Sequence, residues 1–260
     1  MTLHLYRIQH EEETGYAVLN DDRFFFLDPR DRNQPVSSER SFGKDECAIL
    51  NPTQPSKIIG VGLNYRDHAE ERKKPIPLQP LLFLKPSSAL LAPGESILMP
   101  EMSERVDPEG ELAIVIGERA SQLKGQEEAN AYIFGYSCIN DVTARDLQDK
   151  DVQFTRAKSF DTFAPYGPCV AIGLDPADLA VMTRVNGETR QSSRTSQLIF
   201  SPQYLVWYIS QIMTLMPGDV IATGTPSGIA PVHAGDVIEV EIEGIGILRN
   251  SVEKRTLTAR

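Results

Sequence analysis

Hydrophobic residues recur along this chain mainly at the short intervals typical of β-strands. Apolar and polar residues alternate strictly over 237–242, and residues 112–116 form an unbroken apolar run. These patterns predict two strands, and in the second of them Leu112, Ile114 and Ile116 should bury one face. We expect further strands over 57–62, 80–84, 94–100, 133–142, 220–222 and 245–252. The protein should therefore be rich in β-structure.

Helical spacing is strong at one place, after Ser201-Pro202, which is typical of a helix start. Apolar residues then recur with helical periodicity at Leu205, Ile209, Ile212 and Met213, before Pro217-Gly218 ends the helix. Shorter helices are expected over 64–74 and 126–132. Because strands outnumber helices and the two do not alternate regularly, the pattern predicts an α+β fold and not a doubly wound parallel sheet.

The first part of the chain differs from the rest. Short alternating segments are followed by a polar stretch from Asp28 to Asp45, and Pro52 and Pro55 then interrupt the chain before the next apolar strand. We therefore predict a small N-terminal α/β domain over 1–55 and a catalytic domain over 56–260.

Composition and charge narrow the possible partners. The chain has 260 residues, of which 41% are hydrophobic and 24% charged, and its formal net charge is −10. This charge and the shortness of the basic runs argue against nucleic acid, and no apolar stretch is long enough to predict a membrane span. Three cysteines without metal-binding or disulfide spacing favour the reducing cytoplasm.

Two carboxylates stand at the start of the apolar 112–116 run. Residues two apart in a strand point the same way, so Glu109 and Glu111 should project together. A third carboxylate, Asp141, ends another apolar segment. Clustered carboxylate oxygens are typical ligands of Mg²⁺, Mn²⁺ or Ca²⁺. The alternative is a solvated pair of glutamates at a strand edge.

Other polar residues favour a reaction centre. Lys158 lies between small and aromatic residues, and it could serve either the substrate or the acidic cluster as an ion-pair partner. His68 and Glu71 are three residues apart, so on a helix the carboxylate could orient an imidazole that acts as a general base. The alternative for His68 is an ordinary surface histidine.

The order of short motifs from about residue 57 to 250 resembles the fumarylacetoacetate hydrolase family. The motifs are Gly62-Leu63-Asn64-Tyr65 with His68, Leu82-Phe83-Leu84-Lys85-Pro86, Glu109-x-Glu111, Asn140-Asp141-Val142-Thr143-Ala144-Arg145-Asp146, Lys158-Ser159-Phe160 and Gly224-Thr225-Pro226-x-Gly228. The resemblance implies a mixed β-sandwich roll, a homodimer and a small 2-oxo acid substrate. It also implies Mg²⁺ or Mn²⁺ bound by Glu109, Glu111 and Asp141.

The resemblance assigns roles to further residues. Lys158 and Gln148 match positions that face a substrate carbonyl, where a cation and an amide donor would stabilise an oxyanion. Thr225 matches a position that holds the substrate carboxylate, and Lys85 and Arg145 match positions near the substrate. Arg145 could instead pair with Asp146 or with a metal-binding carboxylate.

The resemblance leaves the reaction open. We expect a metal-dependent hydrolase that cleaves a C–C bond of acylpyruvate-type substrates through a pyruvate enolate. Oxaloacetate decarboxylation and the isomerisation or tautomerisation of a 2-hydroxyhepta-2,4-diene-1,7-dioate-like acid use the same enolate. A catalytically silent metal-binding protein is a further alternative.

Overall fold

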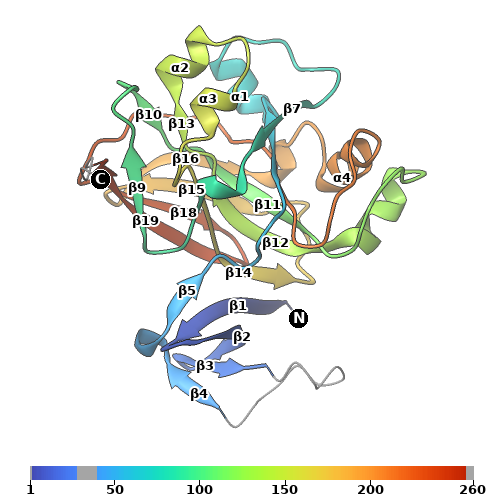
Figure 1. Ribbon diagram of the computed structural model, residues 1–260. Helices are drawn as coiled ribbons and strands as arrows, with labels where there is room; N and C mark the ends of the chain where they lie inside the picture. Colours follow the sequence, from blue (N-terminus) through green and yellow to red (C-terminus); the bar gives the residue numbers. More distant parts are fainter. Residues whose placement is uncertain (1, 28–39, 256–260) are drawn as a thin grey trace.

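The computed structural model describes residues 2–27 and 40–255, and within them β-strands dominate (Figure 1). The larger sheet has twelve strands. Its main order is β4 (Ser41–Gly43), β3 (Arg23–Phe26), β2 (Glu13–Asn20), β1 (Leu3–His10), β14 (Ala164–Ile172), β12 (Ile133–Asn140), β11 (Gly110–Ile116), β17 (Val220–Ala222), β6 (Ile58–Gly62) and β7 (Leu81–Lys85), while β5 (Ala48–Leu50) pairs with β1 and β8 (Leu90–Leu91) with β14.

A second sheet packs against the central strands of the first. Its order is β16 (Glu188–Arg194), β15 (Ala180–Val185), β18 (Val237–Ile242), β19 (Gly246–Lys254) and β9 (Ser96–Met99), and a separate two-stranded pair joins β10 (Val106–Asp107) to β13 (Thr143–Ala144). The main hydrophobic core joins Leu112 and Ile114 of β11 to Val181 and Val240 of the second sheet. The predicted β-rich α+β fold is confirmed.

Strand β11 is buried on both faces. Leu112, Ile114 and Ile116 belong to the core between the sheets, whereas Ala113 and Val115 pack in a second cluster on the opposite face. The predicted alternation is therefore correct, and this strand lies between β12 and β17 at the centre of the larger sheet. A residue at the end of such a strand has little freedom to move.

Helices are short and mostly gather at one end of the molecule, where α1, α2 and α3 lie together (Figure 1). The bounds are α1 (Arg66–Glu71), α2 (Arg145–Lys150), α3 (Thr155–Lys158) and α4 (Pro202–Ser210), with 3₁₀ helices η1 (Lys44–Glu46), η2 (Ser87–Ala89), η3 (Gln126–Tyr132) and η4 (Thr195–Gln197).

The predicted helix start at Ser201-Pro202 is confirmed, because the Ser201 hydroxyl accepts a hydrogen bond from Tyr204 N–H. The predicted end is wrong. Helix α4 stops at Ser210, and Ile212 lies outside it with 56% of its surface exposed. Apolar periodicity continued past the helix because Met213 still packs against the core from the following turn.

Strands β1 to β5 carry their own hydrophobic cluster, formed around Ile8, Ala17, Phe24 and Phe26. Their sheet is nevertheless continuous with the larger body, since β1 pairs antiparallel with β14. The division near residue 55 stays a prediction, and residues 28–39 of its polar stretch lie outside the described residues.

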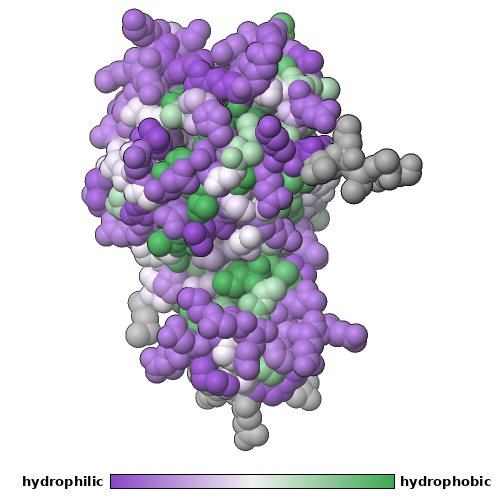
Figure 2. All heavy atoms as spheres, turned by 90° about the vertical axis from the view of Figure 1, so that its left-hand side faces the viewer, coloured by the Kyte–Doolittle hydropathy of each residue, from purple (hydrophilic) through white to green (hydrophobic). Residues whose placement is uncertain are grey.

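The surface seen in Figure 2 is mostly hydrophilic, with apolar residues gathered where the N-terminal strands meet the larger body. A groove at this junction is lined by residues such as Ile49, Pro93 and Ile247. Among the described residues, no helix is long and apolar enough to cross a membrane.

A buried carboxylate ties the start of β6 to the turn before β17. Asp219 is fully buried and accepts hydrogen bonds from Ser56 Oγ at 2.7 Å, from Met216 N–H at 2.8 Å and from Lys57 Nζ. Burial acts to raise the pKa of Asp219, but the hydrogen bonds from Lys57, Met216 and Ser56 outweigh it and the pKa lies below its usual value.

We expect Asp219→Asn to lower the free energy of unfolding by about 1–2 kcal/mol at neutral pH, because a charged acceptor loses its donors. A depressed pKa stabilises the fold above the unfolded value of about 3.9, and this contribution is lost as pH falls. Urea unfolding at neutral and acidic pH measures both effects. Asp178→Asn, at an exposed ion pair with Arg194, serves as control and should cost less. An Asp219→Asn penalty that persists undiminished in acid would contradict this account.

Candidate metal centre and cavity

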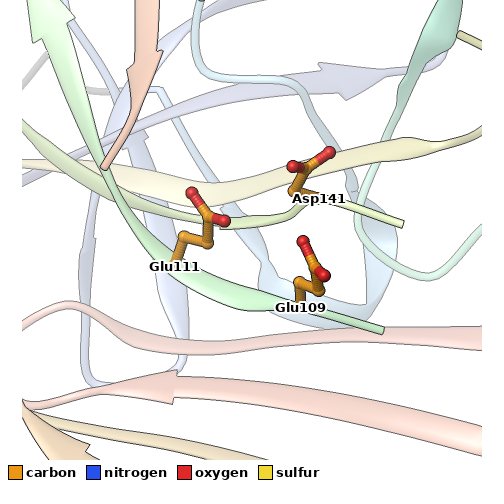
Figure 3. Close-up of side chains that lie close together, drawn as sticks. All are labelled: Glu109, Glu111 and Asp141. Carbon is orange, nitrogen blue, oxygen red and sulfur yellow. The ribbon is translucent and has the colours of Figure 1, made fainter. Parts of the chain in front are cut away.

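The register of two central strands brings three carboxylates together. Gly110 of β11 pairs with Asn140, the last residue of β12, so Asp141 follows directly beside Glu109. The backbone N–H of Asp141 donates to Glu109 O at 2.8 Å. Figure 3 shows the side chains of Glu109, Glu111 and Asp141 converging, and each offers an oxygen that lies within 4.8 Å of the others.

All three carboxylates are buried, with 4% of Glu109, 2% of Glu111 and 1% of Asp141 exposed. The alternative of a solvated strand edge is therefore wrong. Buried anions require compensation by cations or donors, since the loss of hydration costs several kcal/mol per ion. Cationic side chains compensate two of these three carboxylates, and the third has only a backbone donor.

Three cations contact two of the carboxylates. Lys158 Nζ donates to Glu109 Oε2 at 2.7 Å and to Asp141 Oδ2 at 2.5 Å. Arg145 also donates to Glu109, and Lys85 donates to Asp141. The alternative interpretation of Lys158 as an ion-pair partner of the acidic cluster thus describes its position in this structure.

The surroundings of Glu111 differ from those of the other two carboxylates. It accepts a hydrogen bond from Gly224 N–H at 2.7 Å, and no cationic side chain among the described residues is within ion-pair distance of it. Burial, followed by the charges of Asp141 and Glu109, raises the pKa of Glu111 well above its usual value. For Glu109, burial is outweighed by Lys158 and Arg145, so its pKa is lowered.

This donor set fits a hard divalent cation. Three carboxylate oxygens converge, and one of the carboxylates, Glu111, has no cationic side-chain partner among the described residues. Mg²⁺ and Mn²⁺ favour such oxygen ligands, and three protein donors leave about half of roughly six coordination positions for other oxygens.

Backbone and side-chain hydrogen bonds fix the peptide between the two glutamates. Gly110 N–H donates to Gln191 Oε1 at 2.9 Å, and Gly110 O accepts from Thr225 Oγ1 at 3.1 Å. Gln191 Nε2 also donates to Thr225 Oγ1 at 2.7 Å, which closes the network. A Cβ at Gly110 would lie only 2.1 Å from Thr183 Oγ1, so glycine is required here.

Sequence reasoning missed Gln191 altogether. It lies on β16 of the second sheet, 81 positions from Gly110, and belongs to a polar strand pattern with no local signal of function. Asn140, whose Oδ1 accepts from Glu109 N–H at 2.9 Å, was present in a recognised motif but had no assigned role.

Helix α1 delivers the predicted imidazole–carboxylate pair. His68 Nδ1 lies 3.0 Å from Glu71 Oε2, and Glu71 Oε1 accepts from Gly228 N–H at 2.9 Å. His68 is 7% exposed, so it is not the surface histidine of the alternative interpretation. Asp67 further anchors the helix by accepting from Ser193 Oγ at 2.6 Å.

A cavity of about 430 Å³ connects these groups. It is lined by Val61, Gly62, Leu63, His68, Arg72, Lys74, Leu81, Phe83, Glu109, Glu111, Asp141, Arg145, Gln148, Asp149, Phe154, Lys158 and Thr225. The predicted metal ligands, the predicted base and several predicted substrate residues therefore share one space. Such a concave site with convergent polar groups is the usual setting for a small ligand.

The remaining predicted substrate residues differ in placement. Arg145 donates to Gln148 Oε1, which leaves the Gln148 amide N–H groups for the cavity. Arg145 pairs with Glu109 and Asp107 and not with Asp146. Lys85 is fully buried behind Asp141 and does not line the cavity, so it is placed to hold that carboxylate and not to contact a substrate.

The Gly224–Gly228 loop closes one side of the site. Gly224 has a φ of +103°, and a Cβ there would lie 2.8 Å from the Asn64 Cβ, so a larger residue would not fit. The Thr225 hydroxyl, expected to hold a substrate carboxylate, is engaged with Gly110 and Gln191. The loop is thus braced against the carboxylate cluster.

Comparisons with known proteins agree with this geometry. Residues 57–253 match the family described as fumarylacetoacetate (FAA) hydrolase, C-terminal. A relative from Bos taurus, named mitochondrial oxaloacetate tautomerase FAHD2A, is 41% identical over 222 residues, which cover 80% of this chain and 70% of the relative.

Solved structures share the fold over nearly the whole chain. A 2-hydroxyhepta-2,4-diene-1,7-dioate isomerase from Mycobacterium marinum is 38% identical with a TM-score of 0.89, and the match covers 97% of this chain and 99% of that one. A maleylpyruvate hydrolase from Sphingobium sp. SYK-6, solved with manganese(II) and pyruvate, is 27% identical with a TM-score of 0.82 and coverage of 98% and 100%. Motifs, fold and matched residues together show that this chain belongs to the fumarylacetoacetate hydrolase family.

Proposed function

We propose that this protein is a divalent-metal-dependent hydrolase that cleaves the C3–C4 bond of acylpyruvate-type 2,4-dioxo acids. The observation that carries the proposal is that the buried His68, held by Glu71, lines the same cavity as the three converging carboxylates. A base and a metal-binding cluster in one enclosed space are what hydrolytic carbon–carbon cleavage requires.

Glu109, Glu111 and Asp141 would hold Mg²⁺ or Mn²⁺. When bound, such an ion would stabilise negative charge that develops on the C2 oxygen of the substrate. The manganese and pyruvate in the maleylpyruvate hydrolase structure support both this choice of ion and the class of small 2-oxo acids. Ca²⁺ is a weaker candidate because it favours more ligands than three carboxylates and a small substrate provide.

His68 would remove the proton from the attacking water. Glu71 holds Nδ1, so the other ring nitrogen, Nε2, is left for the cavity side. The water oxygen adds to C4, and the C3–C4 bond breaks with its electron pair moving toward C3. The C4 fragment leaves as a carboxylic acid, and the proton that His68 took from the water passes to C3 to complete pyruvate. General-base help of this kind contributes roughly 10²–10⁴-fold.

Lys158 and Gln148 would stabilise the oxyanion that forms at C4. Lys158 Nζ bridges Glu109 and Asp141 at the floor, and the Gln148 amide faces the cavity with its oxygen held by Arg145. Positioned donors of this kind act strongly where water is excluded. Their fixed partners keep both groups in place before a substrate arrives.

Tautomerisation or isomerisation of a 2-oxo acid is the second candidate. The names of the bovine relative and of the M. marinum structure favour it, since both are more similar to this chain than the maleylpyruvate hydrolase is. The same base would then move a proton at C3 and no water would be needed. Oxaloacetate decarboxylation would likewise need no activated water.

Incubation of the purified protein and Mn²⁺ with acetylpyruvate, oxaloacetate and a 2-hydroxymuconate separates these reactions. We expect pyruvate and acetate from acetylpyruvate as the fastest conversion. Faster keto–enol exchange of oxaloacetate would favour the tautomerase instead. The absence of turnover with all three substrates would leave only a silent metal-binding protein.

Removing the uncompensated carboxylate should weaken metal binding specifically. Glu111→Gln should lower Mn²⁺ affinity by at least about tenfold, because a charged ligand becomes a neutral amide. Titration calorimetry with Mn²⁺ measures this loss. Glu118→Gln, an exposed position just beyond the other end of β11, is the matched control and should bind Mn²⁺ as the wild type does. Equal affinities for wild type and Glu111→Gln would remove Glu111 from the metal site.

His68→Ala should separate hydrolysis from decarboxylation. We expect acetylpyruvate hydrolysis to fall by about 10²–10⁴-fold, since the water loses its base. Oxaloacetate decarboxylation, followed by CO₂ release, should fall far less. A similar loss in both reactions would mean that His68 does not act through water.

A further inference from the structure

Two cations lie at the exposed side of the cavity, away from the buried carboxylates. Arg72 and Lys74 belong to the segment that follows α1, and both line the cavity. Arg72 Nη2 lies 3.4 Å from Asp149 Oδ1 on α2, in a pair whose side chains are 35% and 59% exposed. Among the described residues, Lys74 has no ion-pair partner.

The cavity changes character from its floor to this rim. At the floor, Lys158 Nζ lies over the Phe83 ring at 5.0 Å from its centroid. The Phe83 ring in turn contacts Phe154 edge to face, with ring centroids 5.7 Å apart. An apolar wall therefore begins at the buried ionic floor, and the exposed residues Arg72, Lys74 and Asp149 complete the lining.

The charges of the lining residues also differ between the two ends. The lining contains as many cationic as anionic side chains, namely Arg72, Lys74, Arg145 and Lys158 against Glu109, Glu111, Asp141 and Asp149. A divalent cation at the carboxylates would leave an excess of two positive charges in the cavity. The divalent cation at the floor would bind one anionic group of a substrate. The unpaired Lys74 at the rim would bind a second anionic group.

We propose that Lys74, assisted by Arg72, selects 2-oxo acids that carry a second carboxylate at the end remote from the oxo group. This inference rests on the proposed function, because the 2-oxo acid end must occupy the carboxylate floor. The middle of the substrate would be a short carbon chain against Phe83 and Phe154. Lys74 is a specificity residue in this scheme and takes no part in bond breaking.

Matched ligands test the proposal without turnover. Titration calorimetry on the Mn²⁺-loaded protein would compare 2-oxoadipate with 2-oxohexanoate, and 2-oxoglutarate with 2-oxopentanoate. Each pair shares its chain length and its 2-oxo acid end and differs in the terminal carboxylate. We expect the better dicarboxylate to bind about five- to tenfold more tightly than its partner, with the preference shrinking at about 0.5 M salt.

Variants at the rim assign the preference to Lys74. Lys74→Gln should abolish most of it while leaving monocarboxylate binding within about twofold, and Lys74→Glu should reverse it. Asp149→Asn should strengthen dicarboxylate binding, because an opposing charge is removed. Lys73→Gln is the matched control, since Lys73 is the exposed neighbour of Lys74 but does not line the cavity.

The outcomes separate the two proposals. Equal binding of both members of each pair, or a preference that survives Lys74→Gln, would overturn the role of Lys74 and leave the proposed function standing. Failure of every 2-oxo acid to bind the Mn²⁺-loaded protein would overturn both.

Discussion

The burial of three carboxylates where two central strands meet is the constraint on which the rest of this structure depends. Anions packed this closely repel one another, and removing them from water costs several kcal/mol each. The fold offsets this cost with Lys158, Lys85 and Arg145, but these cations contact Glu109 and Asp141 and leave Glu111 with a backbone donor. Glu111 therefore lines the cavity without a cationic partner, and a divalent ion bound there would supply the missing positive charge.

Rigidity around the carboxylates comes from both sheets. Strands β11 and β12 set the register, and β16 of the second sheet supplies Gln191, whose amide holds both Gly110 and Thr225. Helix α1 is tied to the same framework, because Glu71 accepts from Gly228 and Asp67 accepts from Ser193. The imidazole and the metal-binding oxygens are therefore both held by hydrogen bonds to the same two elements, the 224–228 loop and β16. Preorganisation of this kind is what electrostatic catalysis requires.

The parts that sequence predicted well are those encoded locally. The alternation around Glu109 and Glu111, the Ser201 cap and the spacing of His68 and Glu71 each depend on a few neighbouring residues. The ordered motifs then placed Asp141 and Lys158 in the same site through family resemblance. The sequence alone did not indicate that β11 would be buried on both of its faces.

The parts that sequence could not predict depend on long-range contacts. The role of Gln191 follows from strand pairing across 81 positions, and Lys85 lies behind Asp141 only because β7 is the edge strand beside β6. The end of α4 was misplaced since Met213 packs on the core without being helical. The Arg72 and Lys74 rim likewise emerges only when α1 and α2 are brought together.

A crystal structure of the Mn²⁺-loaded protein, with anomalous diffraction recorded at the manganese edge, tests the central claim most directly. We predict one strong anomalous peak within bonding distance of oxygens from Glu109, Glu111 and Asp141. A manganese peak elsewhere, or none at this cluster while Lys158 still bridges Glu109 and Asp141, would contradict the account.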